Sequence, residues 1–169
     1  MQSRRFRRAV WALSFGVAAV ALAGCDYFAE KRLVPGVNTE GDVRMLMGQP
    51  DMIWEEPNGA KKLEYPRGPQ GVTTYFVHIA PDGKFQKIEQ VLVESNFAKI
   101  KVGMTRDDVR RELGRQTETT PYALSNEEVW SWRYAGDNGM TLFFNAHFDR
   151  ATGLVKRISR IQDWKTMGN

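Results

Sequence analysis

Apolar residues along the chain follow two different patterns. Residues 9–24 are almost all apolar or small and form one continuous run. From residue 33 onwards, apolar residues four positions apart give way to segments in which apolar and polar residues alternate. The four-residue spacing is typical of an amphipathic helix, and the alternation is typical of a strand with one buried face. The chain beyond residue 33 therefore predicts short helices and antiparallel strands.

A ten-residue helical segment occurs twice with identical spacing. Residues 39–48 read TEGDVRMLMG, and residues 105–114 read TRDDVRRELG. The threonine that opens each copy is an N-cap candidate, and the acid three residues later completes a capping-box pattern. The glycine that closes each copy suits the left-handed conformation in which many helices end. The repeat therefore predicts one short helix in each half of the chain.

Three strand candidates follow each of these helices in the same order, separated by turns that contain glycine. Their last residues are Tyr65, Ile79 and Ile88 in the first half, and Tyr134, Phe148 and Ile158 in the second. A unit of about 60–65 residues buries little surface by itself. We therefore expect an α+β fold in which two tandem repeats pack together, each a short helix (or helix pair) with a three-stranded antiparallel sheet.

The boundaries of these parts follow from the same pattern. Residues 33–96 are expected to form the first repeat, residues 97–163 the second, and residues 164–169 a C-terminal tail. Loops are expected at residues 57–59 and 117–126, which are rich in turn-forming and polar residues.

The N-terminal apolar run is typical of a cleaved export signal. Four arginines and no acid precede it, and Asp26 follows it closely. It is therefore shorter than the roughly 20 apolar residues that a membrane-spanning helix needs. We interpret residues 1–24 as a signal peptide, whose removal from the 169-residue chain leaves 145 residues, about the length of one ordinary domain.

The signal ends in a segment that resembles the lipobox of bacterial lipoproteins, made of Leu22, Ala23, Gly24 and Cys25. The resemblance implies that cleavage leaves Cys25 as the first residue of the mature protein. It also implies a diacylglyceryl group on the Cys25 thiol and an N-linked acyl chain. Cys25 is the only cysteine of the chain, so an internal disulfide bond is excluded. Residues 25–32 are then a short lipidated tether.

The net charge of the chain changes once the signal is removed. The chain carries 24 Lys+Arg against 20 Asp+Glu, but four of the arginines lie in the signal, so the mature protein is formally neutral. Nucleic-acid binding thereby loses its main support. Residues 26–96 carry 8 basic and 11 acidic groups, whereas residues 97–169 carry 12 and 9. This difference predicts complementary packing of the two repeats. As an alternative, Lys156, Arg157 and Arg160 would form a basic edge for lipid headgroups.

Residues 101–114, KVGMTRDDVRRELG, are similar to the GMT-x-x-x-V-x-x-x-LG signature of the SmpA/OmlA lipoproteins, also called the BamE family. Residues 36–50 show the pattern more loosely. The resemblance implies helices against a three-stranded antiparallel sheet, a lipid anchor at the outer membrane, and a non-enzymatic accessory role in the insertion of β-barrel proteins. Family members typically have one unit, whereas this chain has two. Tandem units of similar topology occur in the β-lactamase-inhibitor proteins.

No catalytic motif is apparent in the sequence, which has no G-x-S-x-G, H-E-x-x-H, P-loop or cysteine pair. His78 and His147 occupy similar positions in the two repeats, and partly exposed sheet residues are a simpler interpretation than metal ligands. The acidic pair at residues 107–108 fits a helix N-terminus, and the pair at residues 127–128 fits a solvated loop. We expect no enzymatic activity, no metal, no cofactor other than the lipid and no small-molecule substrate.

Aromatic residues are the candidates for a protein-binding face. They are Trp130, Trp132 and Tyr134 on one strand, with Trp54, Tyr65 and Tyr75 as counterparts in the first repeat. Most of them are expected to fill the core, because large aromatic side chains dominate protein cores. Any ring that stays exposed on a sheet face would contribute to a binding patch.

These observations predict a lipid-anchored, periplasm-facing envelope protein that binds another protein, with the barrel-assembly machinery as the suspected partner. The alternatives are a tandem clamp-like inhibitor or envelope sensor and, with less support, a hydrolase without a recognisable motif. The family resemblance favours the outer membrane. Asp26, directly after Cys25, favours the inner membrane, since enteric bacteria read it as a retention signal. We expect the outer membrane.

Overall fold

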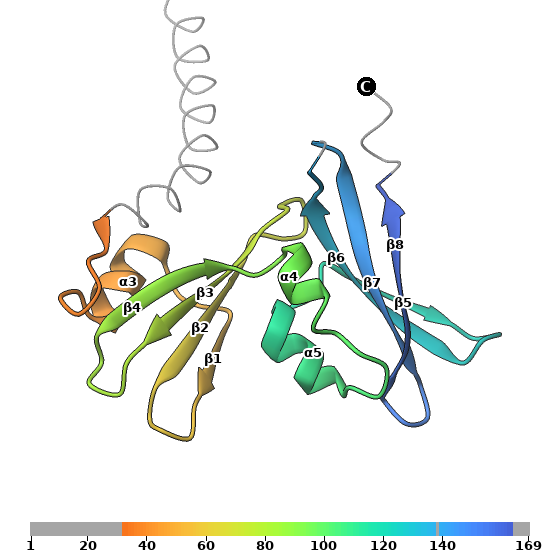
Figure 1. Ribbon diagram of the computed structural model, residues 1–169, viewed down its shortest axis with the longest axis horizontal. Helices are drawn as coiled ribbons and strands as arrows, with labels where there is room; N and C mark the ends of the chain where they lie inside the picture. The colour runs from red at the N-terminus through yellow and green to blue at the C-terminus, as the bar shows by residue number, and fades with distance from the viewer. Residues whose placement is uncertain (1–31, 138, 164–169) are drawn as a thin grey trace, which may run out of the picture.

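The computed structural model describes residues 32–137 and 139–163 (Figure 1). The signal peptide, Cys25, Asp26 and the C-terminal tail lie outside the described residues. Within the described part of the chain, no helix combines the length and hydrophobicity that crossing a membrane requires.

The described residues form two units that follow one another along the chain. The first consists of α3 (Glu40–Met47), β1 (Met52–Glu55), β2 (Lys61–Pro66), β3 (Thr74–Ile79) and β4 (Phe85–Gln90). The second consists of α4 (Glu94–Phe97), α5 (Arg106–Leu113), β5 (Glu118–Tyr122), β6 (Glu127–Ala135), β7 (Thr141–Asp149) and β8 (Val155–Gln162). Each unit has one antiparallel sheet with its strands in sequence order. This two-unit α+β architecture agrees with the prediction.

The expected three-stranded sheets are wrong, because each sheet has a fourth strand. β1 is only four residues long, and all five residues of β5 are exposed and include Pro121. Neither segment therefore shows the alternation that reveals a strand. Most of the loop expected at residues 117–126 is β5, whereas the expected loop at residues 57–59 does connect β1 to β2. Both missed strands lie at a sheet edge.

α3 and α5 begin and end as the repeated segment predicts. Thr39 and Thr105 cap them, and in each capping box the threonine hydroxyl accepts from the backbone N–H three residues later. The acid at that position accepts in return from the threonine N–H, at 2.8 Å in α3 and 2.9 Å in α5. Gly48 and Gly114 follow the helices with φ of 83° and 73°, a region that favours glycine. The repeat thus fixes both helix ends.

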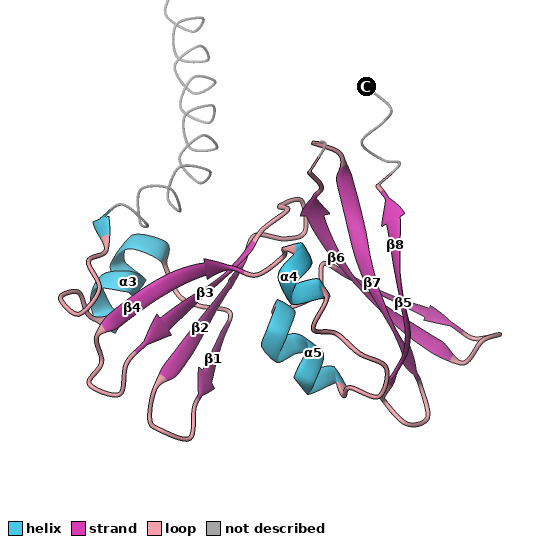
Figure 2. Cartoon of the chain, in the orientation of Figure 1, coloured by secondary structure: helices cyan, strands magenta, loops and turns pink. Residues whose placement is uncertain are grey.

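Each sheet packs on its own helix, and α5 lies between the two sheets (Figure 2). One face of the first sheet covers α3 and forms a core that includes Leu63 and Val77. Phe76 points from the opposite face and joins the second core, together with α4, α5 and the second sheet. Phe97 of α4 belongs to this second core, so the boundary expected between residues 96 and 97 falls inside α4.

Opposite charges join the two units around α5. Asp51 of the first unit binds Arg110 at 3.1 Å and Arg115 at 2.5 Å. The ammonium group of Lys62 donates to the carbonyl oxygen of Arg111 at 2.6 Å. The acidic character of the first repeat and the basic character of the second therefore meet at their contact, in agreement with complementary packing.

Candidate functional site

The candidate site is the face of the second sheet that points away from α5, which we call the outer face. Side chains cross it in three rows: Thr120, Val129, His147 and Arg157; Ser131, Asn145 and Ser159; Arg133, Phe143 and Ile161. No described helix covers this face (Figures 1 and 2). A solvated sheet face normally carries polar residues, whereas here Val129 and Phe143 are buried among charged neighbours. This mixture distinguishes the outer face from an ordinary solvated surface.

A buried carboxylate lies at one end of the outer face. Glu127, the first residue of β6, is only 4% exposed. Arg157 donates to both of its oxygens, at 2.8 and 3.3 Å, and Lys156 lies 3.7 Å away. The hydrogen bond from Arg157 lowers the pKa of Glu127 from its ordinary value of 4.5 to about 2, against an opposing effect of burial. Glu127 is therefore an anion at any physiological pH.

His147 connects this carboxylate to a serine hydroxyl. Its Nδ1 lies 3.2 Å from Glu127 Oε2, and its Nε2 lies 2.9 Å from Ser159 Oγ. Burial is the main cause that lowers the pKa of His147, and Arg157 adds to the effect, while Glu127 opposes it. Asn145 Nδ2 donates to the same serine oxygen at 3.4 Å, and Asn145 Oδ1 is buried without a hydrogen-bond partner. The outer face thus holds a continuous polar chain from Glu127 to Asn145.

The shifted pKa of Glu127 makes the stability of the protein depend on pH. Because the pKa is lower in the folded state, ionisation of Glu127 stabilises the fold fully above about pH 4.5, and this contribution is lost as the pH falls toward 2. Denaturant unfolding of wild type and Glu127→Gln between pH 7 and 2 is expected to show a stability difference that shrinks below pH 4.5. Other carboxylates titrate in both proteins and cancel. A difference that stays constant down to pH 2 would contradict the pairing.

Sequence analysis did not find this polar chain. It assigned Glu127 to a solvated loop and His147 to a partly exposed sheet position, whereas both are buried in strands. Glu127, His147 and Ser159 come from three different strands and are 12 to 32 residues apart in the chain. Only the strand register brings them together, and the register was not predicted. The sequence did contain one usable indication, since His147 and Ser159 occupy positions at which the alternation along their strands points side chains away from the core.

The aromatic residues predicted as a binding face lie elsewhere. Trp132, Tyr134 and Tyr65 are buried in the cores, so their assignment to a binding face is wrong and their expected role as core residues is confirmed. Trp130 and Tyr75 are half-buried and pack against the same cores. The half-buried ring of the sixth residue, Trp54, lies under the guanidinium groups of α5 and donates its indole N–H to Glu64. These rings hold helices and units together.

The basic edge that was considered for lipid headgroups is not formed. Arg157 points to the outer face, where it binds Glu127 together with Lys156. Arg160 points to the opposite face, where it binds Glu94 at 2.7 Å and lies over Phe144. Alternation along β8 separates the two arginines, so these side chains present no common surface to a membrane.

The other histidine, His78, pairs with a single carboxylate. His78 Nε2 lies 3.2 Å from Glu89, and burial lowers the pKa of His78. Among the residues that the structure describes, no group of three or more His, Cys, Asp or Glu side chains is arranged to hold a metal ion.

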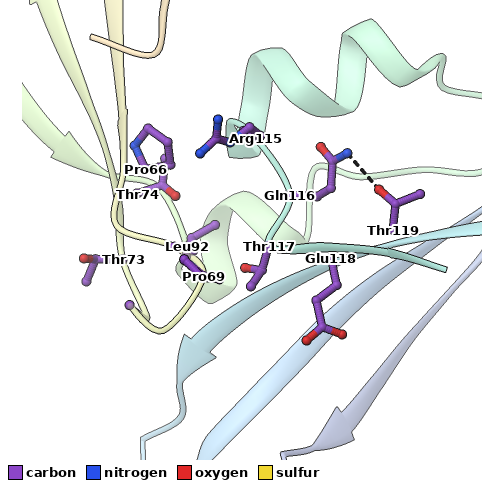
Figure 3. A pocket seen from close by; sticks show the side chains of 12 residues that line it. Pro66, Pro69, Thr73, Thr74, Leu92, Arg115, Gln116, Thr117, Glu118 and Thr119 are labelled. Atoms are coloured by element: carbon purple, nitrogen blue, oxygen red, sulfur yellow. Dashed lines mark hydrogen bonds between the residues drawn. The ribbon is translucent and has the colours of Figure 1, made fainter. Parts of the chain in front are cut away.

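A cavity lies between the two units. This cavity, of about 380 Å³, is bounded by the connection between β2 and β3 and by the segment that leads from α5 into β5 (Figure 3). Arg115 at its wall is already bound to Asp51, and Gln116 donates to Thr119 at 3.0 Å. Arg133 also donates to the carbonyl oxygen of Gln70. The residues that line this cavity include no histidine and no exposed large apolar side chain, whereas the outer face has both, so the outer face is the stronger candidate for a site.

Comparison with known proteins gives no family assignment, since no family model and no curated protein sequence matches the chain. Among solved structures, similarity extends to YjgB, a DUF4309 family protein from Bacillus subtilis (15% identity, 83% of this chain and 92% of that chain, TM-score 0.28). It extends also to a "putative beta-lactamase inhibitor protein" from Streptococcus mutans (9% identity, 81% and 95%, TM-score 0.30). At these TM-scores the similarities carry no conclusion about function, and the resemblance to the SmpA/OmlA family stays a prediction.

Proposed function

We propose that this protein is a lipid-anchored, periplasm-facing envelope lipoprotein that binds another protein through its outer face. The composition of that face is the observation that carries the proposal. Tyr122 and Ile161 are each 53% exposed on it. Its principal charges are already paired, since Glu127 binds Arg157, and Arg133 binds Asp163 at 2.8 Å. The face therefore suits a partner with an apolar patch and a polar rim, which is the usual anatomy of a protein interface.

The expected position of the lipid anchor, at Cys25, is consistent with a partner-binding role for the outer face. Six residues lie between Cys25 and the first described residue, Arg32, so the seven steps from one Cα to the next span at most about 25 Å. Lipidation at Cys25 would hold the first unit close to the bilayer, with Val34 and Val37 exposed at this end. The second sheet lies at the other end of the described molecule (Figure 1). The outer face would therefore stay accessible to a partner in the periplasm.

Crosslinking in native membranes followed by affinity purification tests the proposal. The full-length protein is expected to recover an envelope partner, with subunits of the barrel-assembly machinery as the expected class. Ile161→Glu places a charge on the outer face and should reduce recovery by about tenfold or more. Ile158→Glu is the matched control: the residue is on the same strand, 40% exposed, but on the opposite face. It should leave recovery within about twofold of wild type.

The other outcomes of this experiment are equally informative. Equal recovery with Ile161→Glu and wild type, at equal thermal stability, would contradict docking at the outer face. Repeated absence of barrel-assembly subunits would contradict that partner class. A Cys25→Ser variant that still sediments with membranes would contradict the lipid anchor.

A further inference from the structure

Three side chains of the outer face are ordered as a nucleophile, a base and an acid that orients the base. Because Glu127 is ionised and only accepts, the proton of neutral His147 belongs on Nδ1, which faces Glu127 Oε2 at 3.2 Å. His147 Nε2 then carries a lone pair, and Ser159 Oγ donates to it at 2.9 Å. This is the arrangement by which a histidine activates a serine hydroxyl.

We propose that Ser159 is a nucleophile that accepts an acyl group from an ester, with His147 as its general base and Glu127 as a positioning residue. This activity goes beyond protein binding and does not depend on the identity of the docking partner. The sequence analysis kept a hydrolase only as its least supported alternative, because the three residues share no local motif.

The step balances with residues of the chain, an ester and water. Ser159 Oγ forms a bond to the carbonyl carbon of the ester while its proton passes to His147 Nε2. The bond from that carbon to the alcohol oxygen breaks, and the alcohol leaves with the proton from Nε2. Water then attacks the acylated serine, gives a proton to Nε2 and releases the carboxylic acid. Ser159 regains its proton from His147, and Glu127 stays ionised throughout.

The surroundings of Ser159 define the kind of ester that would react. Asn145 Nδ2 donates to Ser159 Oγ at 3.4 Å, so one amide N–H group lies directly beside the proposed nucleophile. Ser159 is partly exposed on an open sheet, so the acyl donor would be presented at a surface rather than enclosed. Such a site favours an activated or surface-bound ester over a small ester free in solution.

A fluorophosphonate probe tests the proposal on the full mature chain in detergent, because it reacts with activated serines with loss of fluoride. Mass spectrometry is expected to locate the label on Ser159, at least about 100-fold faster than on Ser131. Ser131 is the matched control, since it lies in the same row of the same face. Ser159→Ala should abolish the label, and Ser125→Ala, at an exposed serine in the turn between β5 and β6, should leave the rate at Ser159 unchanged.

Variants of the other two residues distinguish catalysis from packing. His147→Gln should lower the labelling rate by about 100-fold, the usual contribution of a general base. Glu127→Gln should lower it because an amide N–H opposite Nδ1 favours the other imidazole tautomer.

The pH dependence of the labelling rate is measured on the wild-type protein alone, so it does not depend on whether a variant folds. Its labelling rate should be constant from pH 8 down to 6.5 and fall below it, since the pKa of His147 is below its ordinary value. Arg157 and Lys156 also face this group but stay charged over the range. Labelling of Ser159 no faster than of Ser131, or a rate that does not fall at any acid pH at which the protein stays folded, would overturn the proposal.

Discussion

Replacing Trp132 with alanine is expected to lower the free energy of unfolding by about 3–5 kcal/mol. Trp132 is fully buried and is the largest side chain of the core that joins the two units. Its indole N–H donates to the carbonyl oxygen of Gly114 at 2.9 Å, where α5 ends. Truncation therefore leaves a cavity against Phe144 and removes the partner of a buried carbonyl group. Urea unfolding followed by circular dichroism measures the loss.

Two further variants separate the contributions of volume and hydrogen bond. Trp132→Phe keeps most of the ring and loses the N–H group, so it should cost less than Trp132→Ala. Leu124→Ala is the surface control, because Leu124 is fully exposed in the turn between β5 and β6, and it should change stability by less than about 0.5 kcal/mol. A loss below about 1 kcal/mol for Trp132→Ala would show that the site collapses or is already hydrated.

The parts of the fold that the sequence predicts are those with local causes. The two helices could be placed because each carries its own cap, apolar pair and terminal glycine within ten residues. The core role of Trp132 followed from its size and alternation. β5 was missed because an edge strand needs burial on neither face, and Pro121 removes a backbone donor.

The candidate site could not be predicted from the sequence, for a different physical reason. Pairing of Val129 with His147, and of His147 with Arg157, is decided by the register of three strands. A shift of one residue would turn each of these side chains to the other face. Burial of Glu127 likewise depends on cations from β8 and not on its sequence neighbours. The sequence therefore shows which residue types are present, but it does not show which of them lie side by side in the fold.

The second large effect is expected at Glu64, a fully buried carboxylate between the two units. Glu64 accepts from the backbone N–H of Arg115 at 2.6 Å and from the indole N–H of Trp54 at 3.1 Å, and Arg110 lies 3.5 Å away. Glu64→Leu leaves these donors without their acceptor in a buried place. Removing one partner of a buried ion pair usually costs about 3–5 kcal/mol, and we expect a loss of this size.

The matched variants at this contact separate charge from shape. Glu64→Gln keeps an oxygen for the N–H of Arg115 but lacks the charge that faces Arg110, so about half the loss is expected. Asp51→Asn removes a carboxylate that binds Arg110 and Arg115 but is 22% exposed in its side chain, so water can replace it and the loss should stay near 1 kcal/mol or less. Because Glu64 is the fully buried carboxylate among the groups that span the units, its loss should make them unfold in two steps. A single transition with Glu64→Leu as stable as Asp51→Asn would mean that apolar packing around Phe76 and the contacts of Asp51 and Lys62 suffice to join the units without Glu64.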